Sequence, residues 1–174
     1  MTTMAIIVTG AREGARQTDV SRALDAWHSA RPVGLLIHGD CEDPKCERPR
    51  QLGFDHHDDV VQWQTAGRYP HGLSVDRCAE QWARHRSLRW HAMPADWYPH
   101  RQGFKRGPMD RAAGPKRNRR MAQELRRYQQ AGRKVAVLAF PGGNGTADMV
   151  RVAKSLGLPV WRAVDGQWRR DDGV

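Results

Sequence analysis

Short apolar runs alternate with amphipathic stretches along most of the chain, and this alternation limits the folds that the chain can adopt. A continuous apolar run of about six residues is typical of a strand buried in a parallel sheet. Strands that alternate with helices form a parallel sheet covered by helices on both faces. We therefore predict an α/β, doubly wound fold with a mainly parallel five-stranded sheet. The predicted strands are Met4–Gly10, Val33–Gly39, Leu88–Pro94, Arg133–Phe140 and Leu158–Val164, and the predicted helices are Asp19–Ala30, Ser74–His85, Gly114–Gly132 and Thr146–Gly157.

The length of 174 residues suits a single domain, which we expect to cover the whole chain, 1–174. A polar, irregular stretch at about 41–71 follows the second predicted strand. It is too long for an ordinary connection, so we interpret it as an insertion. The residues from about 165 to 174 have the composition of a charged tail.

The insertion contains residue types that bind zinc, namely Cys41, Cys46, His56 and His57, and zinc would order a loop that has no core of its own. Against a zinc site stand the wide spacing of the two cysteines and the lack of a second cysteine pair. The alternative is a solvated polar insertion with incidental histidines. We favour this alternative and assign no metal ligand.

Composition restricts the compartment and the partners. Three cysteines are too few for a secreted disulfide framework, and neither a secretory leader nor an apolar run of about 18 residues is visible. We therefore expect a cytoplasmic protein that does not enter a membrane. The net charge of +10 is concentrated between Arg101 and Lys134, where Asp110 and Glu124 are the only acidic residues. Such a patch attracts nucleic acid or a phosphorylated small molecule, although a solvated helix face has the same composition.

A glycine-rich loop, PGGNGT from Pro141 to Thr146, joins the fourth predicted strand to the fourth predicted helix. Backbone N–H groups at the start of a helix form an anion site, and phosphate is its common occupant. The loop is neither a Walker A motif nor the dinucleotide fingerprint that follows a first strand. A tight turn whose glycines serve packing alone is the alternative. In a parallel sheet the carboxyl ends of the strands meet, which would bring Gly10–Arg12 and His38–Asp40 to this loop.

Four segments carry a resemblance to a known family: IIVTGAR, LLIHGD, AAGPKRNRRM and AFPGGNGTADMVRVAKSLGLPVW, together with the predicted helix GLSVDRCAEQWA. They resemble the Lonely Guy (lysine decarboxylase-like) phosphoribohydrolases, and still more the YspA-type, cpYpsA-related branch of the SLOG superfamily. The resemblance covers nearly the whole chain apart from about 41–71. It implies a Rossmann-like nucleotide-binding domain that assembles as a homo-oligomer, commonly a dimer.

The resemblance also implies which residues form the site. The loop would hold a phosphate group, the residues at the ends of the first two strands would flank it, and Gly72 and Asp76 would match a glycine and an aspartate of the family. From the residues themselves we expect Arg117 and Asn118 to point into the site from a helix start, and Trp97 either to wall a base or simply to pack. The expected binding residues are Gly10, Arg12, Gly39, Asp40, Gly72, Asp76, Trp97, Arg117, Asn118, Pro141, Gly142, Gly143, Asn144, Gly145 and Thr146.

Hydrolysis in the phosphoribohydrolases requires an arginine at a helix start and the glutamate of PGGxGTxxE. Arg117, four residues before Met121, matches the arginine, whereas Met149 occupies the glutamate position. Methionine cannot transfer a proton, and the neighbouring Asp148 is rotated by roughly 100 degrees around a helix. Arg117 and Asp148 are thus the candidate catalytic residues of a reaction that this sequence does not favour.

We therefore expect a protein that binds a nucleotide or nucleotide-derived ligand at the strand ends, as a sensor or sequestering module, with no cofactor required. Two alternatives stay open. The first is an N-glycoside hydrolase of the phosphoribohydrolase type acting on nucleoside monophosphates. The second is a module that binds single-stranded nucleic acid, as the related domain of the DNA-processing protein DprA does.

Overall fold

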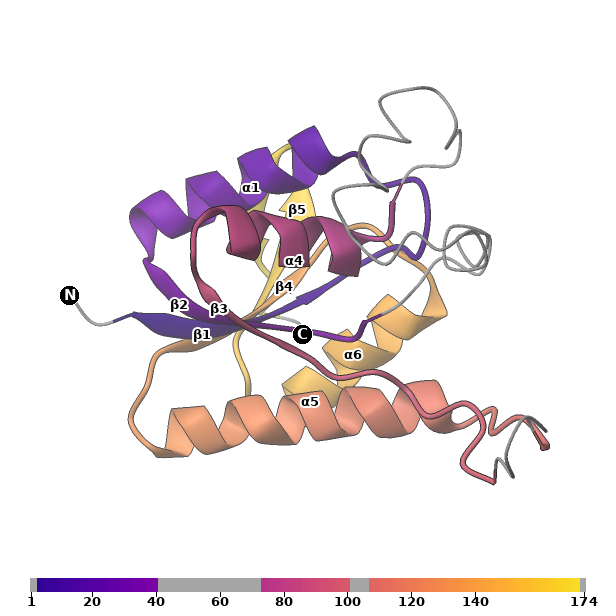
Figure 1. The fold of residues 1–174 in the computed structure, drawn as a ribbon. Helices are drawn as coiled ribbons and strands as arrows, with labels where there is room; N and C mark the ends of the chain where they lie inside the picture. The colour runs from indigo at the N-terminus through magenta and orange to yellow at the C-terminus, as the bar shows by residue number, and fades with distance from the viewer. Residues whose placement is uncertain (1–2, 41–72, 101–106, 173–174) are drawn as a thin grey trace.

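The fold is built on one mainly parallel sheet. The computed structural model describes residues 3–40, 73–100 and 107–172 (Figure 1). The sheet has six strands in the order β3-β2-β1-β4-β5-β6, and all neighbouring pairs are parallel except β5 and β6. The strands are β1 (Met4–Thr9), β2 (Val33–His38), β3 (Arg89–Ala92), β4 (Val135–Ala139), β5 (Val160–Val164) and β6 (Gln167–Arg170).

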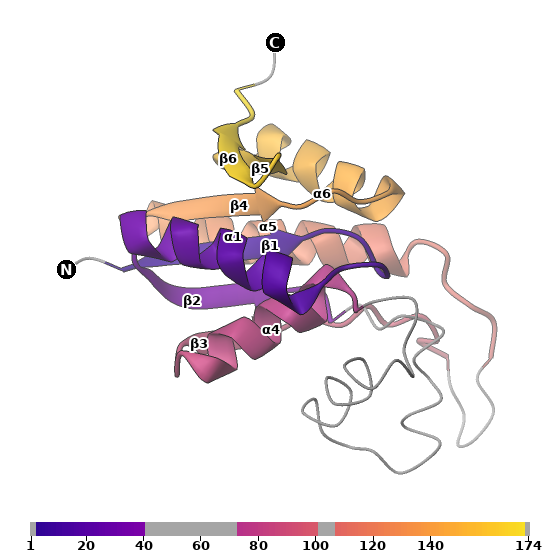
Figure 2. The same cartoon turned by 90° about the horizontal axis from the view of Figure 1, so that it is seen from above.

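Helices cover both faces of the sheet, which makes the fold Rossmann-like and confirms the predicted doubly wound α/β class. α1 (Gln17–Ala30) and α4 (Val75–His85) lie side by side on one face (Figures 1 and 2). α5 (Ala113–Gln130) and α6 (Asn144–Ser155) lie on the other. Each face therefore has its own apolar core, and the central strands are buried from both sides.

The burial of the central strands explains why their sequences are continuous apolar runs. Every residue of β4 is buried, and so is every residue of β1 except Thr9 at its end. Alternate side chains of β1 enter opposite cores, so that Ile6 packs under α1 and α4 while Ile7 packs over α5 and α6. A polar side chain at either position would be buried without a hydrogen-bond partner, which costs free energy. Apolar residues avoid this cost.

The sheet has one strand more than predicted, because part of the expected charged tail forms the edge strand β6. The turn before it places Asp165 at φ 49° and Gly166 at φ 75°, the left-handed pair that a two-residue hairpin requires. Trp168 anchors the strand: its indole N–H donates to the carbonyl of Ala23 at 2.8 Å, and its ring packs edge-on against Trp27 and Phe140. The Asp-Gly pair was the sequence signal for this hairpin.

The predicted insertion at about 41–71 lies outside the described residues, and with it Gly72 and the zinc candidates Cys41, Cys46, His56 and His57. In the described part of the chain, no helix has the length and apolar content needed to cross a membrane.

Candidate functional site

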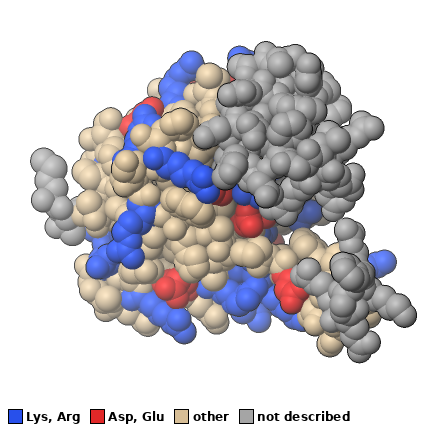
Figure 3. Space-filling view, in the orientation of Figure 1, with Lys and Arg blue, Asp and Glu red and all other residues tan. Residues whose placement is uncertain are grey.

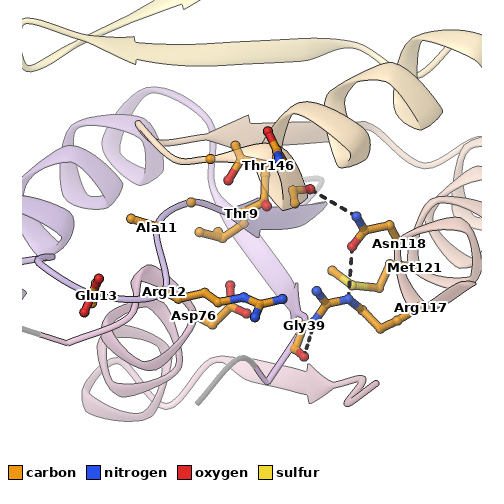
Figure 4. Close-up of a pocket in the computed structure, with 15 residues that line it drawn as sticks. Thr9, Ala11, Arg12, Glu13, Gly39, Asp76, Arg117, Asn118, Met121 and Thr146 are labelled. Carbon is orange, nitrogen blue, oxygen red and sulfur yellow. Dashed lines mark hydrogen bonds between the residues drawn. The ribbon is translucent and has the colours of Figure 1, made fainter. Parts of the chain in front are cut away.

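A cavity of about 500 Å³ opens at the carboxyl ends of the central strands. The strand order reverses between β1 and β4, because the chain proceeds from β1 to β2 and β3 on one side and returns to β4 on the other. Such a reversal leaves a crevice in which doubly wound folds bind their ligands. The cavity lies at this point (Figure 4) and is lined by Val8, Thr9, Gly10, Ala11, Arg12, Glu13, Gly39, Asp76, Arg117, Asn118, Met121, Gly143, Asn144, Gly145 and Thr146.

Two loops pack against each other at one end of this cavity. The backbone N–H of Ala11, after β1, donates to the carbonyl of Pro141, after β4, at 3.0 Å. A Cβ on Gly142 would lie 2.9 Å from the carbonyl carbon of Gly10, and a Cβ on Gly10 would lie 2.5 Å from Val75. Gly142 is therefore required for the close approach of the glycine loop to the backbone after β1, and Gly10 for the close approach of that backbone to α4.

The amino end of α6 presents hydrogen-bond donors at the cavity. Gly143 caps the helix and accepts from the N–H groups of Thr146 and Ala147 at 3.0 and 3.1 Å. Asn144 and Gly145 begin the helix, so their N–H groups have no carbonyl one turn earlier in it. No side chain caps the helix. The loop thus has the geometry of an anion site, with free amides at the positive end of a helix dipole.

The hydroxyl of Thr146 is the one buried polar group of the cavity wall that lacks a partner among the described residues. Thr146 is 5% exposed, and its Oγ1 makes no hydrogen bond there. A buried hydroxyl without a partner costs about 1–3 kcal/mol, so such groups are rare unless a ligand or water satisfies them. The Oγ1 atom lies against Gly142, so a ligand in the cavity would satisfy this hydroxyl after the side chain turns about χ1.

Arg117 and Asn118 start the buried face of α5 and connect it to the two neighbouring strand ends. Arg117 donates through Nη1 to the carbonyl of Gly39 and through Nε to Oδ1 of Asn118, the latter at 3.0 Å. Asn118 donates in turn to the carbonyl of Gly145 at 3.1 Å. Gly39 has to be glycine, because a Cβ there would overlap the guanidinium of Arg117. Both polar side chains line the cavity.

Arg12 and Asp76 complete the polar wall. In Figure 4 the side chains of Arg12 and Arg117 enter from opposite sides of the cavity and point toward each other, with Asp76 beside Arg12. Trp97 does not line the cavity. Its ring instead faces the guanidinium of Arg12, whose central carbon lies 5.4 Å from the ring centroid. The cavity therefore combines two cationic side chains and the carboxylates of Asp76 and Glu13 with the donors of the glycine loop.

Asp40 lies outside the cavity and belongs to a charged network behind it. Arg77 contacts the carboxylates of Asp40 at 3.0 Å and Glu80 at 3.3 Å. His38 is fully buried, and its Nε2 lies 3.4 Å from Glu80. Burial lowers the pKa of His38, and the opposing attraction of Asp76 and of the network carboxylates is weaker. His38 is therefore neutral at pH 7.

The tautomer of His38 bears on whether this network could hold a metal ion. Ligand atoms of His38, Asp40 and Glu80 lie within 4.8 Å of one another. Nδ1 of His38, however, accepts from the backbone N–H of Asp40 at 3.1 Å, so the neutral ring carries its proton on Nε2. A protonated Nε2 has no lone pair for a metal, and Arg77 already supplies a positive charge between the carboxylates. We therefore interpret the cluster as a structural charge network.

The two residues that bear on hydrolysis are directed elsewhere. Asp148 accepts from Asn118 at 2.9 Å, forms an ion pair with Arg151 and does not line the cavity. Met149 is fully buried in the apolar core between α6 and the sheet. The position of the family's glutamate thus contributes to the core rather than to the cavity.

The lining of the cavity differs from the predicted set at the start of the glycine loop, at the end of β1 and beside two predicted arginines. Pro141 and Gly142 do not line the cavity; they hold the loop in place. The residues that line it and were not among the predicted binding residues are Val8, Thr9, Ala11, Glu13 and Met121. Glu13 follows Arg12 in the β1–α1 loop, and Met121 lies one helical turn after Arg117, so proximity to a predicted residue was the available signal.

No family model, curated protein or solved structure matches the chain, and the fold assignment therefore depends on the topology itself.

Proposed function

We propose that the protein binds a nucleotide or nucleotide-derived ligand at the carboxyl ends of β1, β2 and β4, with a phosphate group on the loop Gly142–Thr146. One observation carries the proposal: α6 begins at the cavity with the amides of Asn144 and Gly145, and the next residue, Thr146, has a buried hydroxyl without a partner in the described structure. A phosphate oxygen accepts from the amides, and from the hydroxyl once its side chain turns toward the cavity, and the helix dipole favours its charge.

The rest of the cavity fits the same ligand class. Its volume of about 500 Å³ lies in the range of small-molecule sites and exceeds that of a phosphate ion alone. Arg12 and Arg117 add two positive charges, and guanidinium groups bind phosphate through paired hydrogen bonds. Asp76 offers a carboxylate that accepts hydrogen bonds from sugar hydroxyls. The ligand class thus combines phosphate with a hydroxylated organic part.

The motif order described from the sequence supports a finer assignment within the same proposal. PGGNGT, the Arg117 helix start and the GAR and HGD strand ends favour a YspA-type member of the SLOG superfamily acting as a sensor or sequestering module. Hydrolysis of the phosphoribohydrolase type is disfavoured, because Met149 lies in the core and Asp148 is engaged by Asn118 and Arg151. A homo-oligomer remains part of the proposal by resemblance alone.

Thermal denaturation with candidate ligands tests the proposal. Nucleoside monophosphates, NAD, ADP-ribose and ribose 5-phosphate would be compared with inorganic phosphate. A ligand at a hundred times its Kd adds about 2.7 kcal/mol, which raises the melting temperature by several degrees in a chain of this size. Arg117→Lys is expected to lose most of the shift, because lysine lacks the planar fork. The matched control is Arg119→Lys, on the exposed side of the same helix. The absence of any shift with the wild-type protein would contradict the proposal.

Single-stranded nucleic acid is a second candidate partner, favoured by the outer face of α5. Lys116, Arg119 and Arg120 are exposed there, with Arg111 just before the helix. Figure 3 shows Lys and Arg side chains gathered along the edge of the molecule where α5 lies, with a few acidic side chains between them. If this face binds phosphate backbones, affinity for an oligonucleotide falls steeply with salt, and Arg119→Glu with Arg120→Glu abolishes it. If this charge reversal leaves oligonucleotide binding unchanged, the outer face of α5 is excluded as the nucleic-acid site.

A further inference from the structure

Trp97 and Arg12 form a cation–π pair beside the cavity. The guanidinium carbon of Arg12 lies 5.4 Å from the centroid of the Trp97 ring. Arg12 lines the cavity and Trp97 does not. An arginine of the protein itself therefore lies between the ring and the cavity.

Trp97 is also held in place by the start of α5. A Cβ on Gly114 would lie 3.3 Å from Cη2 of Trp97, so the ring can pack this close to the helix only because residue 114 is glycine. The carbonyl of Trp97 accepts from the backbone N–H of Asp110 at 2.8 Å. Asp110 is itself fixed by the backbone N–H of Ala112 at 2.9 Å and by Lys116 at 2.8 Å. The indole is thus a fixed platform, whereas Arg12 is an exposed side chain.

The cation–π contact attracts Arg12 without using its hydrogen-bond donors. The attraction acts on the positive charge of the guanidinium, which still carries five N–H donors. No carboxylate within the described part of the chain forms an ion pair with Arg12. The N–H groups of Arg12 are therefore available to a ligand in the cavity.

We propose that Trp97 is a positioning residue that acts through Arg12: the ring holds the guanidinium over the cavity for the charged part of the ligand and does not stack on a base. The proposal rests on the proposed function, because it concerns the affinity of the same site. It implies that the contribution of Trp97 to binding is independent of whether the ligand carries a base.

A double-mutant cycle measured with two probes tests this. Adenosine 5′-monophosphate and ribose 5-phosphate share the phosphosugar and differ in the base. Trp97→Ala is expected to weaken both by a similar factor of about three to ten, and Trp97→Tyr by no more than about twofold, since tyrosine retains a cation–π face. In the Arg12→Ala background, Trp97→Ala is expected to add no further loss. Melting temperatures of all variants without ligand would check that each one is folded.

Two results would overturn the proposal. Losses that add in the double variant would show that Trp97 acts independently of Arg12, and a loss confined to adenosine 5′-monophosphate would make Trp97 a wall for the base. The pairing itself is measured without ligand, as ring-current shifts of the Arg12 side-chain protons that disappear in Trp97→Ala. If the ring-current shifts are present but the wild-type protein binds neither probe, the proposed function is refuted while the contact between Trp97 and Arg12 is confirmed. The absence of these shifts would refute the pairing.

Discussion

Four polar side chains of the cavity wall are buried to at least nine-tenths: Asp76, Arg117, Asn118 and Thr146. Arg117 and Asn118 make hydrogen bonds to Gly39 and Gly145, so that part of their bonding capacity fixes α5 against the strand ends. Thr146 differs, because its hydroxyl has no partner in the described residues. At the scale of single residues, a substitution that removes this hydroxyl is therefore expected to change the binding of a ligand without lowering the stability of the free protein.

Thr146→Val tests this separation. Valine has nearly the shape of threonine and removes the unpaired hydroxyl, so we expect the free energy of unfolding of the free protein to stay equal or rise by about 1 kcal/mol. The affinity for a phosphorylated ligand is expected to fall about tenfold, because a charge-assisted hydrogen bond is lost. Urea denaturation and calorimetric titration measure the two quantities, with Thr146→Ser as the control that retains the hydroxyl. A large loss of stability in Thr146→Val would mean that the hydroxyl has a partner within the protein.

At the scale of elements, the cavity depends on how closely two strand–helix connections approach each other. The β1–α1 connection lies against the β4–α6 connection through Gly10 and Gly142 and through the hydrogen bond between Ala11 and Pro141. Gly145 lies in the same glycine loop, but a Cβ added there would have no neighbouring atom within 4 Å. The glycines of one short motif therefore have different physical roles.

Two alanine substitutions distinguish these roles by the sign of their effect. Gly142→Ala is expected to lower the free energy of unfolding by about 1–3 kcal/mol, because its Cβ overlaps the backbone of Gly10 and Ala11. Gly145→Ala is expected to raise it by about 0.5–1 kcal/mol, since alanine is the better residue within a helix and space is available. Urea denaturation of both variants provides the measurement. Equal destabilisation by the two substitutions would contradict the packing described for the loops.

At the scale of the whole molecule, much of the fold could be predicted from the sequence, because β1, β2 and β4 are buried on both faces and only continuous apolar runs satisfy that environment. β6 could not be recognised from apolar content, since Trp168 is its only large apolar side chain. The strand is defined instead by its turn and by the contact of Trp168 with the core.

The candidate site was predictable to the extent that strand ends converge. That rule brought the residues after β1, β2 and β4 to one place, where Gly39 lies beside Arg117. It could not show that Asp40, one residue further, turns away toward Arg77 at φ 48°. Nor could it show that Trp97 contacts Arg12 rather than the cavity. Such details depend on side-chain partners from distant elements, which a single sequence does not display.

The pH dependence of stability is also a property of the whole molecule, and two buried groups determine its limits. The lowered pKa of His38 means that the unfolded chain binds a proton more readily below pH 6.5, so the free energy of unfolding falls as the pH drops below that value. Burial raises the pKa of Cys78 from 9.0 to about 12, so the unfolded chain releases its proton first and stability falls as the pH rises above 9. We expect a plateau between these limits.

Urea denaturation from pH 5 to pH 10.5 measures this profile. Each group adds a slope of at most about 1.4 kcal/mol per pH unit outside the plateau. His38→Gln is expected to flatten the acid limb alone and Cys78→Ala the alkaline limb alone, whatever each costs in stability at pH 7.5. If the acid or the alkaline limb keeps its slope in the corresponding variant, a group other than His38 or Cys78 causes that slope.

The contact between Gly10 and Gly142 also has a consequence for protein engineering. The two glycines are far apart in the sequence, and the loop of Gly142 rests on the backbone of Gly10 and Ala11. The segment Phe140–Thr146 is consequently not a portable module. Grafted alone onto another parallel sheet it would lose its support, so a successful transplant has to carry Thr9–Ala11 with it.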